Sequence, residues 1–400
     1  MQKIVLAYSG GLDTSAIIPW LKENYKDVEV YALVADVGQE RSELEGVKEK
    51  ALYSGATDCV IVDLKEEFVK NYIYPTILSG AIYEGTYLLG TSMARPVIAK
   101  ALVDYAKSIN ATAIAHGATG KGNDQVRFEY TINALAPDIK TIAPWREWNM
   151  RSRGDLLDYL ASKKIKTTAT KEKIYSKDAN AWHISTEGGV LEDPANFHND
   201  DCFCFSVNPK KAPNESELVE IEFKEGFIVS VNNKSLSPYE SLQILNDLGA
   251  KHGVGRIDIV ENRLIGMKSR GCYETPGGTI INTALRALEQ LILDRDSMKL
   301  RTQLGLEMSY LVYDGKWFCP TREAISAAID IFAKKLTGKV VLELYKGSVQ
   351  ALSKVSSNSL YNQDFATFDK DDVYNQKDAA GFIKIFSLSA KIRALNGKKN

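Results

Sequence analysis

The chain has 400 residues, a length that corresponds to two or three domains and can bury a large core without metals or disulfides. Its 50 Lys and Arg against 51 Asp and Glu give a formal net charge of −1, which argues against bulk nucleic-acid binding, because that requires a strongly basic field. No apolar run reaches the ~18 residues that span a membrane, the first residues lack a signal-peptide pattern, and five widely spaced cysteines fit a reducing compartment. We therefore expect a cytoplasmic protein without a nucleic-acid or membrane partner.

Short apolar runs alternate with helical patterns over the first 165 residues. The apolar runs cover residues 3–8, 28–35, 58–63 and 111–116, and helical spacing is found at 42–54 and 94–108. This alternation predicts βαβ units and a parallel, doubly wound sheet. Pro19 lies inside the helix expected after the first strand, where the apolar spacing continues, so we expect a kink there and not an end.

Strands and helices mix without strict alternation beyond about residue 170, which predicts an α+β domain. Hairpins are expected at 218–231, around Lys224-Glu225-Gly226, and at 312–317, around Asp314-Gly315. Helical patterns cover 239–248, 279–294 and 322–336, followed by a polar surface segment at 352–378 and an amphipathic helix at 379–395. The predicted parts are a nucleotide-binding domain (1–168), a synthetase domain (169–352) and a C-terminal segment (353–400). Its helix is expected to contact a neighbouring subunit or to fold back on its own chain.

One segment at the end of the first strand carries phosphate-binding chemistry. Ser9-Gly10-Gly11-Leu12-Asp13-Thr14-Ser15 leaves the strand and opens a helix. Two glycines allow close approach of an anion to the backbone, the hydroxyl groups add donors, and the helix N-terminus presents free N–H groups with partial positive charge. The segment matches neither the Walker A pattern nor G-x-G-x-x-G. It resembles the PP-loop of the N-type ATP pyrophosphatases, which cut ATP between its α and β phosphorus atoms.

Four further segments narrow this resemblance. They are residues 87–96 (Tyr-Leu-Leu-Gly-Thr-Ser-Met-Ala-Arg-Pro), residues 116–129 (beginning His-Gly-Ala-Thr-Gly-Lys-Gly-Asn-Asp-Gln), Tyr175-Ser176 with 183–185, and 260–263 with 268–276. Together with the PP-loop, they resemble the argininosuccinate synthase family over residues 4 to about 390. The resemblance implies ligation of citrulline to aspartate in arginine biosynthesis, in which ATP gives AMP and pyrophosphate through a citrullyl-adenylate. It also implies a homotetramer, with Mg²⁺ carried in by the ATP phosphates.

The resemblance assigns the site residues to three substrates. The residues implied for ATP are Ala7, Tyr8, Ser9, Gly10, Gly11, Leu12, Asp13, Thr14, Ser15, Ala35 and Gly117. Those implied for citrulline are Tyr87, Ser92, Asn123, Arg127, Ser176, Ser185, Glu261 and Tyr273, and those for aspartate are Thr119, Asn123 and Asp124.

Chemical roles follow from these assignments. Arg127 suits the citrulline carboxylate as a bidentate partner and Glu261 suits the ammonium group. Asp124 should face the aspartate ammonium and is the candidate general base, while Ser9 and Asp13 are the other catalytic candidates.

Other hypotheses compete with this ligase. A PP-loop enzyme that acts on tRNA would usually need a basic surface and catalytic cysteines, and an adenine-nucleotide sensor would need no amino-acid pocket. His198, Cys202 and Cys204 supply three possible zinc ligands without a clear fourth, so we expect no protein-held metal, and Cys202 and Cys204 are expected in a strand, alternating with phenylalanines.

Overall fold

The computed structural model describes residues 2–165, 175–367 and 373–398. The chain divides into two compact units, Met1–Asn358 and Ser359–Asn400. The expected boundary between residues 168 and 169 lies outside the described residues. No helix in the described part is both long enough and apolar enough to cross a membrane.

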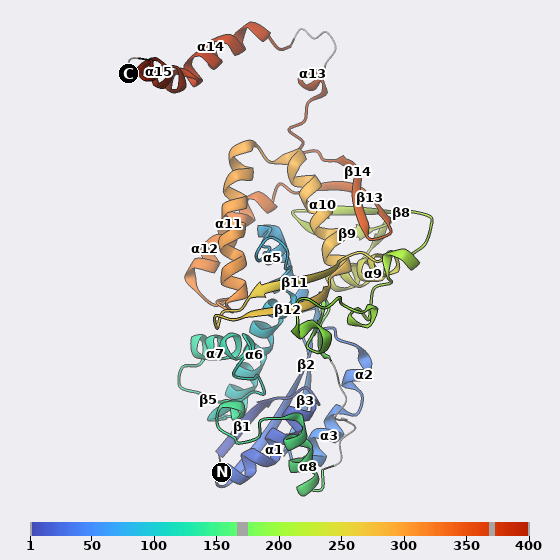
Figure 1. Ribbon diagram of the computed structural model, residues 1–400, viewed down its shortest axis with the longest axis vertical. Helices are drawn as coiled ribbons and strands as arrows, with labels where there is room; N and C mark the ends of the chain where they lie inside the picture. The colour runs from blue at the N-terminus through green and yellow to red at the C-terminus, as the bar shows by residue number, and fades with distance from the viewer. Residues whose placement is uncertain (1, 166–174, 368–372, 399–400) are drawn as a thin grey trace. The chain divides into compact units, whose positions relative to one another are not determined.

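The first half of the larger unit is built around a parallel sheet (Figure 1). Its strand order is β3-β2-β1-β4-β5, and every neighbouring pair runs parallel. The strands are β1 (Gln2–Ala7), β2 (Val28–Asp36), β3 (Asp58–Asp63), β4 (Ala113–Ala115) and β5 (Lys140–Ile142). The predicted parallel α/β domain is therefore confirmed.

Alternate residues of β1 point to opposite faces of this sheet, which buries both. Ile4 packs in one core with Ile17 of the first helix, whereas Val5 packs in a second core with Leu102. The helices of this half are α1 (Leu12–Asn24), α2 (Arg41–Leu44), α3 (Val47–Tyr53), α4 (Lys65–Phe68), a π-helical turn (Val69–Ile73), α5 (Tyr74–Ser79), α6 (Gly90–Ser108), α7 (Asp124–Leu135) and α8 (Arg153–Ser162).

Three of these helices test two predictions. Helix α1 continues through Pro19 to Asn24, so the proline does not end it. The single helix expected over 42–54 is wrong: Gly46 has φ +67° and separates α2 from α3. An α-helix cannot continue through a left-handed residue, so the apolar spacing is divided between two helices.

Two antiparallel sheets follow in the second half. One has the order β10-β9-β8-β13-β14 and the other β11-β12-β7-β6. Their strands are β6 (Ser176–Ala179), β7 (Ile184–Glu187), β8 (Glu217–Lys224), β9 (Phe227–Val231), β10 (Lys234–Ser235), β11 (Arg256–Asn262), β12 (Lys268–Glu274), β13 (Gly338–Tyr345) and β14 (Ser348–Val355). The predicted hairpin around Glu225 is confirmed as β8–β9.

Four helices belong to this half; the first two pack on the sheet that contains β9 and β13, and the other two pack on each other and on α5. They are α9 (Pro238–Lys251), α10 (Pro276–Ile292), α11 (Arg295–Tyr313) and α12 (Pro320–Ala333). The hairpin predicted at 312–317 is wrong, because Val312 and Tyr313 end α11 and Gly315, at φ +75°, turns the chain towards α12. An Asp-Gly pair serves a helix C-terminus as well as a hairpin, and here the residues before it complete the buried face of a helix.

Two loop predictions also need correction. Cys202 lies in a 3₁₀ turn, Asp200–Cys202, and Cys204 follows in a loop; neither is in a strand. The alternation of these cysteines with Phe203 and Phe205 therefore does not arise from a β-strand. The surface segment expected from residue 352 begins later, since β14 continues to Val355 through cross-strand pairing with β13.

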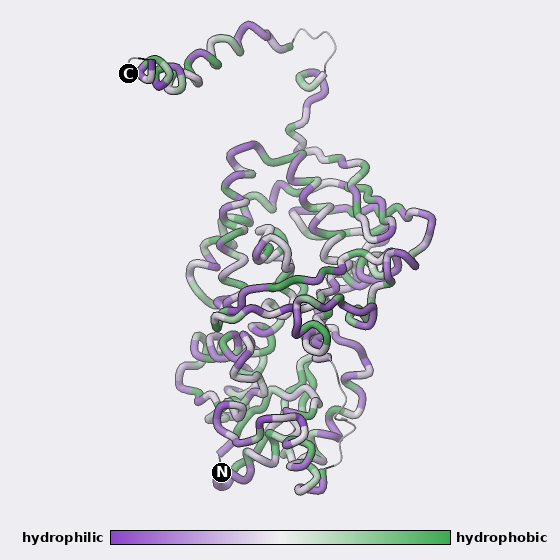
Figure 2. The backbone as a smooth tube through the Cα atoms, in the orientation of Figure 1, coloured by the Kyte–Doolittle hydropathy of each residue, from purple (hydrophilic) through white to green (hydrophobic). Residues whose placement is uncertain are grey.

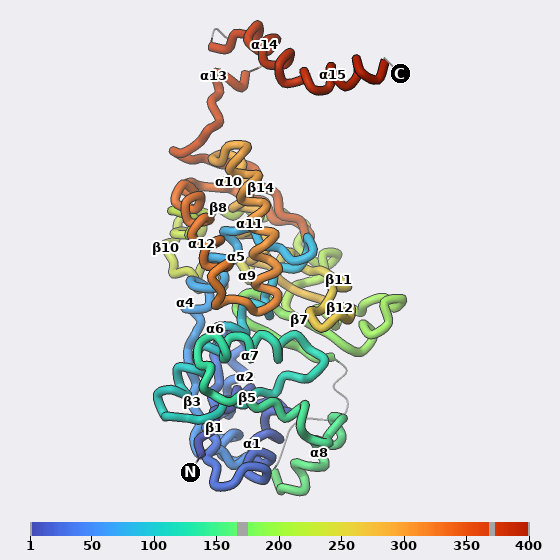
Figure 3. Tube along the Cα trace, turned by 90° about the vertical axis from the view of Figure 1, so that its left-hand side faces the viewer, coloured from blue at the N-terminus to red at the C-terminus, as the bar shows by residue number. Residues whose placement is uncertain are grey.

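The smaller unit contains α13 (Gln363–Ala366), α14 (Gln376–Phe386) and α15 (Leu388–Gly397). The single helix predicted at 379–395 is thus divided at Ser387 into two consecutive helices (Figure 3). Hydrophobic and hydrophilic residues alternate along both (Figure 2), and Phe382, Ile385 and Phe386 are exposed in the single chain.

Candidate active site

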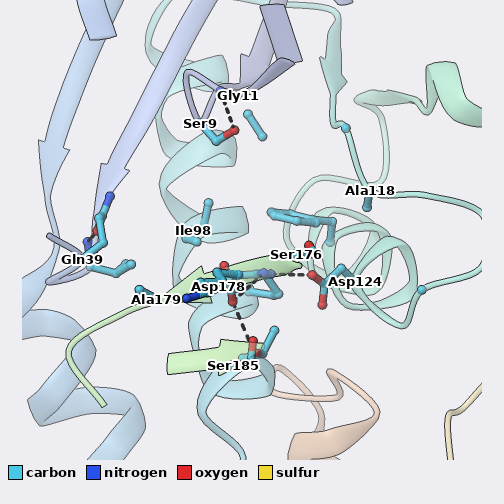
Figure 4. A pocket seen from close by; sticks show the side chains of 18 of the residues that line it. Ser9, Gly11, Gln39, Ile98, Ala118, Asp124, Ser176, Asp178, Ala179 and Ser185 are labelled. Carbon is cyan, nitrogen blue, oxygen red and sulfur yellow. Dashed lines mark hydrogen bonds and ion pairs between the residues drawn. The ribbon is translucent and has the colours of Figure 1, made fainter. Parts of the chain in front are cut away.

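A cavity of about 520 Å³ lies at the carboxyl ends of the parallel strands. Its lining comes from the ends of β1 and β2, from the segment after β4, from α6 and α7, and from the sheet that contains β6, β7, β11 and β12. In Figure 4, Ser9 and Gly11 lie at one end of the cavity and Ser185 at the other. This edge of an open α/β sheet is where such folds bind ligands.

The PP-loop is held in place by its own hydroxyl groups and by α3. The Ser9 backbone N–H donates to Thr14 Oγ1 at 3.4 Å, and the Gly11 N–H donates to Ser9 Oγ at 3.3 Å. Gly10 has φ +72°, a Cβ there would approach Val47 to 2.9 Å, and Lys50 Nζ donates to the Gly10 carbonyl. Helix α1 begins without a side-chain capping bond, and its N-terminus, with the positive end of the helix dipole, attracts an anion.

The structure brings most predicted ATP residues to the cavity. Those that line it are Ala7, Tyr8, Ser9, Gly11, Leu12, Asp13, Thr14, Ala35 and Gly117. Gly10 and Ser15 are not in the lining; Ser15 is buried, with its hydroxyl 3.1 Å from Tyr8 Oη. Ser15 therefore supports Tyr8 from behind the loop.

Strand register gathers polar side chains on one face of the sheet β11-β12-β7-β6. Ser176 pairs with Glu187, Asp178 with Ser185, and Ser185 with Tyr273. Because residues two apart share a face and directly paired residues lie side by side, these five side chains point the same way. All five line the cavity.

The predicted citrulline residues lie around this face. Tyr87, Asn123, Arg127, Ser176, Ser185, Glu261 and Tyr273 line the cavity, and Thr119, Asn123 and Asp124 line it at the loop before α7. Ser92 is fully buried beneath the lining, with an unpartnered hydroxyl oxygen. It is not among the lining residues, although Thr91 of the same helix is, so its role in citrulline binding stays a prediction.

Two arginines enclose Asp124. Arg95 Nε lies 2.9 Å from Asp124 Oδ2, and Arg127 Nη1 lies 3.0 Å from Asp124 Oδ1. Burial opposes ionisation, but these guanidinium groups outweigh it and lower the pKa of Asp124. A carboxylate so stabilised is a weak proton acceptor, which disfavours its expected role as general base.

Arg127 is itself fixed by α11. Its Nε donates to the Tyr313 carbonyl at 2.9 Å, and its guanidinium carbon lies 5.0 Å from the centre of the Tyr313 ring. With Nη1 on Asp124, only Nη2 is without a hydrogen-bond partner among the described residues. Because each terminal nitrogen carries two hydrogens, Nη2 and the second hydrogen of Nη1 remain for the predicted contact with a carboxylate.

Glu261 carries an unsatisfied buried oxygen. Its side chain is 6% exposed, it lines the cavity, and Oε2 has no hydrogen-bond partner among the described residues. Burial raises the pKa of Glu261 to about 7, although Arg127 counteracts the shift. A buried carboxyl oxygen without a donor is suited to a cationic ligand group.

Several lining residues were not predicted. Thr91, Arg95, Asp178, Glu187 and Arg263 all face the cavity. Arg95 also lies 2.9 Å from Asp178 through Nη2, so one guanidinium joins α7 to β6. Arg95 and Arg263 belong to segments that the sequence singled out, but only their contacts distinguish them from surface charges.

The possible zinc ligands do not converge as a set. His198 lies with Asp258 and Cys272, their ligand atoms within 4.8 Å of one another, and this is the only such group of three in the described part of the chain. Arg270 already contacts Asp258 at 2.9 and 2.7 Å, so ion pairing accounts for the carboxylate. The group lies outside the cavity lining.

Comparison with known families decides between the functions that the sequence left open for this cavity. Residues 3–166 match the family described as arginosuccinate synthase N-terminal HUP domain, and residues 175–393 match the arginosuccinate synthase C-terminal domain. The chain belongs to the argininosuccinate synthase family. The function expected from the motifs, ATP-dependent ligation of citrulline and aspartate in arginine biosynthesis, is thereby confirmed, and the chain is an enzyme.

Curated argininosuccinate synthases resemble the chain over its full length. The protein of Serratia proteamaculans is 64% identical over 400 residues, covering 100% of this chain and 98% of that protein. The protein of Cronobacter sakazakii is 64% identical over 399 residues, and that of Buchnera aphidicola is 62% identical over 394, covering 98% of both chains. Among solved structures, a U34-tRNA thiolase of Methanococcus maripaludis has a TM-score of 0.28 at 17% identity, covering 43% of this chain and 60% of that one.

Proposed function

We propose that the cavity carries the argininosuccinate synthase reaction in three adjoining subsites, for ATP, citrulline and aspartate. The observation that carries this proposal is the convergence of the PP-loop, the polar sheet face and the loop before α7 on one cavity. The ureido oxygen of citrulline attacks the α-phosphorus of ATP and pyrophosphate leaves. The aspartate amine then attacks the ureido carbon, and AMP leaves with the former ureido oxygen.

The PP-loop residues bind the departing pyrophosphate in this proposal. The N–H groups at the start of α1 and the hydroxyls of Ser9 and Thr14 stabilise the charge that develops as the bond to the β-phosphate breaks. Ser9 and Asp13 remain the catalytic candidates of the loop. Ala35 and Gly117 are small residues that leave room for the nucleoside.

Citrulline is held through its amino-acid group. Arg127 faces the carboxylate with Nη2, and the free oxygen of Glu261 faces the ammonium. Tyr87 and Tyr273, whose ring centres lie 4.8 Å apart, pack on each other and form one aromatic surface beside the aliphatic chain. Ser176 and Ser185 then lie near the ureido end.

Aspartate is held by Thr119, Asn123 and Asp124. Because the two arginines hold Asp124 as a carboxylate, we propose that it orients the aspartate ammonium electrostatically. The Asn123 amide is partly used already, since Nδ2 donates to Tyr313 Oη at 2.9 Å and Oδ1 accepts from Leu264 N–H at 3.0 Å. Its remaining Nδ2 hydrogen can meet a substrate carboxylate.

Substrate omission tests the three subsites. With ATP and Mg²⁺, pyrophosphate formation should require citrulline, and argininosuccinate should appear only when aspartate is added. Pyrophosphate formation independent of both amino acids would overturn the assignment. Tight ATP binding without turnover would favour a nucleotide sensor.

Glu261 should give citrulline binding a characteristic pH dependence. Its pKa of about 7 means that the carboxyl is mostly neutral below pH 7 and charged above it. We expect the KM for citrulline to fall as pH rises from 6 to 8, and Glu261→Gln to raise KM and remove this dependence. Steady-state kinetics across this range measure both, with the exposed substitution Glu307→Gln as the control. An unchanged pH profile in Glu261→Gln would assign the ammonium to another group.

We also propose that the enzyme is a cytoplasmic homotetramer whose nucleotide-binding domain (1–168) and synthetase domain (169–352) share the cavity. Five free cysteines support a reducing compartment. Phe382, Ile385 and Phe386 are each more than 60% exposed, and apolar groups in such a cluster are usually covered by a partner.

Introducing charged side chains into this apolar cluster should reduce the number of subunits in the assembly. We expect Phe382→Glu combined with Phe386→Glu to shift the mass measured by light scattering from that of a tetramer to that of a smaller species. Lys391→Glu, on the exposed surface of α15, is the matched control. An unchanged mass would exclude this cluster from the subunit contact.

A further inference from the structure

The loop between β4 and α7 has a support network of its own behind the cavity. Residues 117–122 carry part of the proposed ATP and aspartate subsites, and Thr119 and Gly120 are exposed. Glycines give this loop a wide range of backbone conformations. Hydrogen bonds from side chains outside the loop are therefore needed to hold it in one of them. These bonds come from buried or half-buried side chains that have no role assigned above.

Gln125, in the first turn of α7, makes the central contacts. Its side-chain Nε2 donates to the carbonyl of Gly120 at 2.8 Å and to that of Gly122 at 3.2 Å. Gln125 is 8% exposed, so these bonds are largely shielded from water. One amide group therefore fixes two carbonyls on either side of Lys121, immediately before Asn123 and Asp124.

Further residues orient this amide. Arg146 Nη1 donates to Gln125 Oε1 at 3.4 Å and lies 2.7 Å from Glu129 Oε1. Since Oε1 faces a cation, Nε2 must face the carbonyls, which sets the amide orientation without ambiguity.

The start of the loop is fixed by the same network. His116 is fully buried; its Nδ1 accepts from the Ala118 N–H at 3.3 Å, and its Nε2 lies 3.3 Å from Glu129 Oε1. Nδ1 is an acceptor only when unprotonated, so Nε2 carries the proton and donates to Glu129. The carboxylate of Glu129 thus connects both ends of the loop.

We propose that Gln125 is a positioning residue that sets aspartate affinity, by holding Gly120 and Gly122 so that Thr119, Asn123 and Asp124 face the substrate. Gln125 is absent from the cavity lining and acts through the backbone alone. The inference rests on the proposed aspartate subsite. It predicts that aspartate binding depends on Gln125 while adenylation of citrulline does not.

The isosteric substitution Gln125→Glu tests this inference in the full-length enzyme. It keeps the oxygen that faces Arg146 but places a carboxylate oxygen against two carbonyl oxygens, which should displace the loop. At pH 8 we expect the KM for aspartate to rise by about tenfold or more, as lost buried hydrogen bonds commonly give. The KM for citrulline and the citrulline-dependent formation of pyrophosphate in a single turnover should stay within about twofold of the unsubstituted enzyme.

Three further variants make the result decisive. Gln303→Glu makes the same change at an exposed position of α11 and should leave every parameter unchanged. Gln125→Met removes the bonds without adding charge and should raise the KM for aspartate by a smaller factor; it replaces Gln125→Glu if thermal unfolding shows that the latter does not fold. Thr119→Val tests the subsite itself and should also raise the KM for aspartate.

The outcomes are distinguishable. If Thr119→Val raises the KM for aspartate and folded Gln125 variants do not, Gln125 has no positioning role and the inference is wrong. If none of these variants changes it, the aspartate subsite is misplaced and the inference falls with it. An equal loss in pyrophosphate formation and in aspartate affinity would show a general effect on the site, which also overturns the inference.

Discussion

Arg127→Leu should raise the KM for citrulline by about 100-fold while ATP binding persists. The substitution removes a buried cation, which leaves the Tyr313 carbonyl without its donor and Asp124 with Arg95 as its only cationic partner of the two. Truncating one partner of a buried hydrogen-bonded charge pair costs about 3 kcal/mol, which corresponds to roughly 100-fold in affinity. Steady-state kinetics with varied citrulline, together with calorimetric titration of ATP, measure the two effects separately.

Arg127→Lys is the matched control for charge. A lysine retains the cation but cannot bond the Tyr313 carbonyl, Asp124 and a substrate carboxylate in the planar arrangement of a guanidinium. We therefore expect an intermediate KM for citrulline. If ATP binding weakened in Arg127→Leu and citrulline affinity did not, Arg127 would belong to the nucleotide subsite instead.

Asp124→Asn should mainly impair the second half of the reaction. It is nearly isosteric, yet it removes the charge that Arg95 and Arg127 contact at 2.9 and 3.0 Å. We expect kcat/KM for aspartate to fall by about 100-fold or more, since one buried and one half-buried arginine lose their shared counter-charge and the substrate ammonium loses its partner. Citrulline-dependent pyrophosphate formation should fall much less.

The pH profile of the same variant tests the role of Asp124. If this residue only orients the ammonium, its lowered pKa predicts no kinetic ionisation of Asp124 near neutral pH. If it were the general base, the unsubstituted enzyme would show an ionisation in kcat that Asp124→Asn removes. Such a loss would contradict the electrostatic role, and so would full aspartate turnover in Asp124→Asn.

Sequence alone predicted the parallel sheet because the inner strands β1 and β2 are buried on both faces, and a short apolar run between polar turns encodes that burial locally. The PP-loop was also locally encoded, since its glycines, hydroxyls and helix start are contiguous. By contrast, the pair Asp314-Gly315 suits either a hairpin or a helix end. Only the packing of α11 against the rest of the chain selects the helix.

The sequence by itself thus determined the phosphate loop, the first four strands of the parallel sheet and, through its motifs, the family. The tertiary structure decided which charges act together. Arg95, Asp124 and Asp178 are separated by up to 83 residues, and nothing in their local patterns distinguishes them from surface ions. Their pKa values and roles depend on burial and on neighbours from other elements, which are properties of the folded chain and not of any segment.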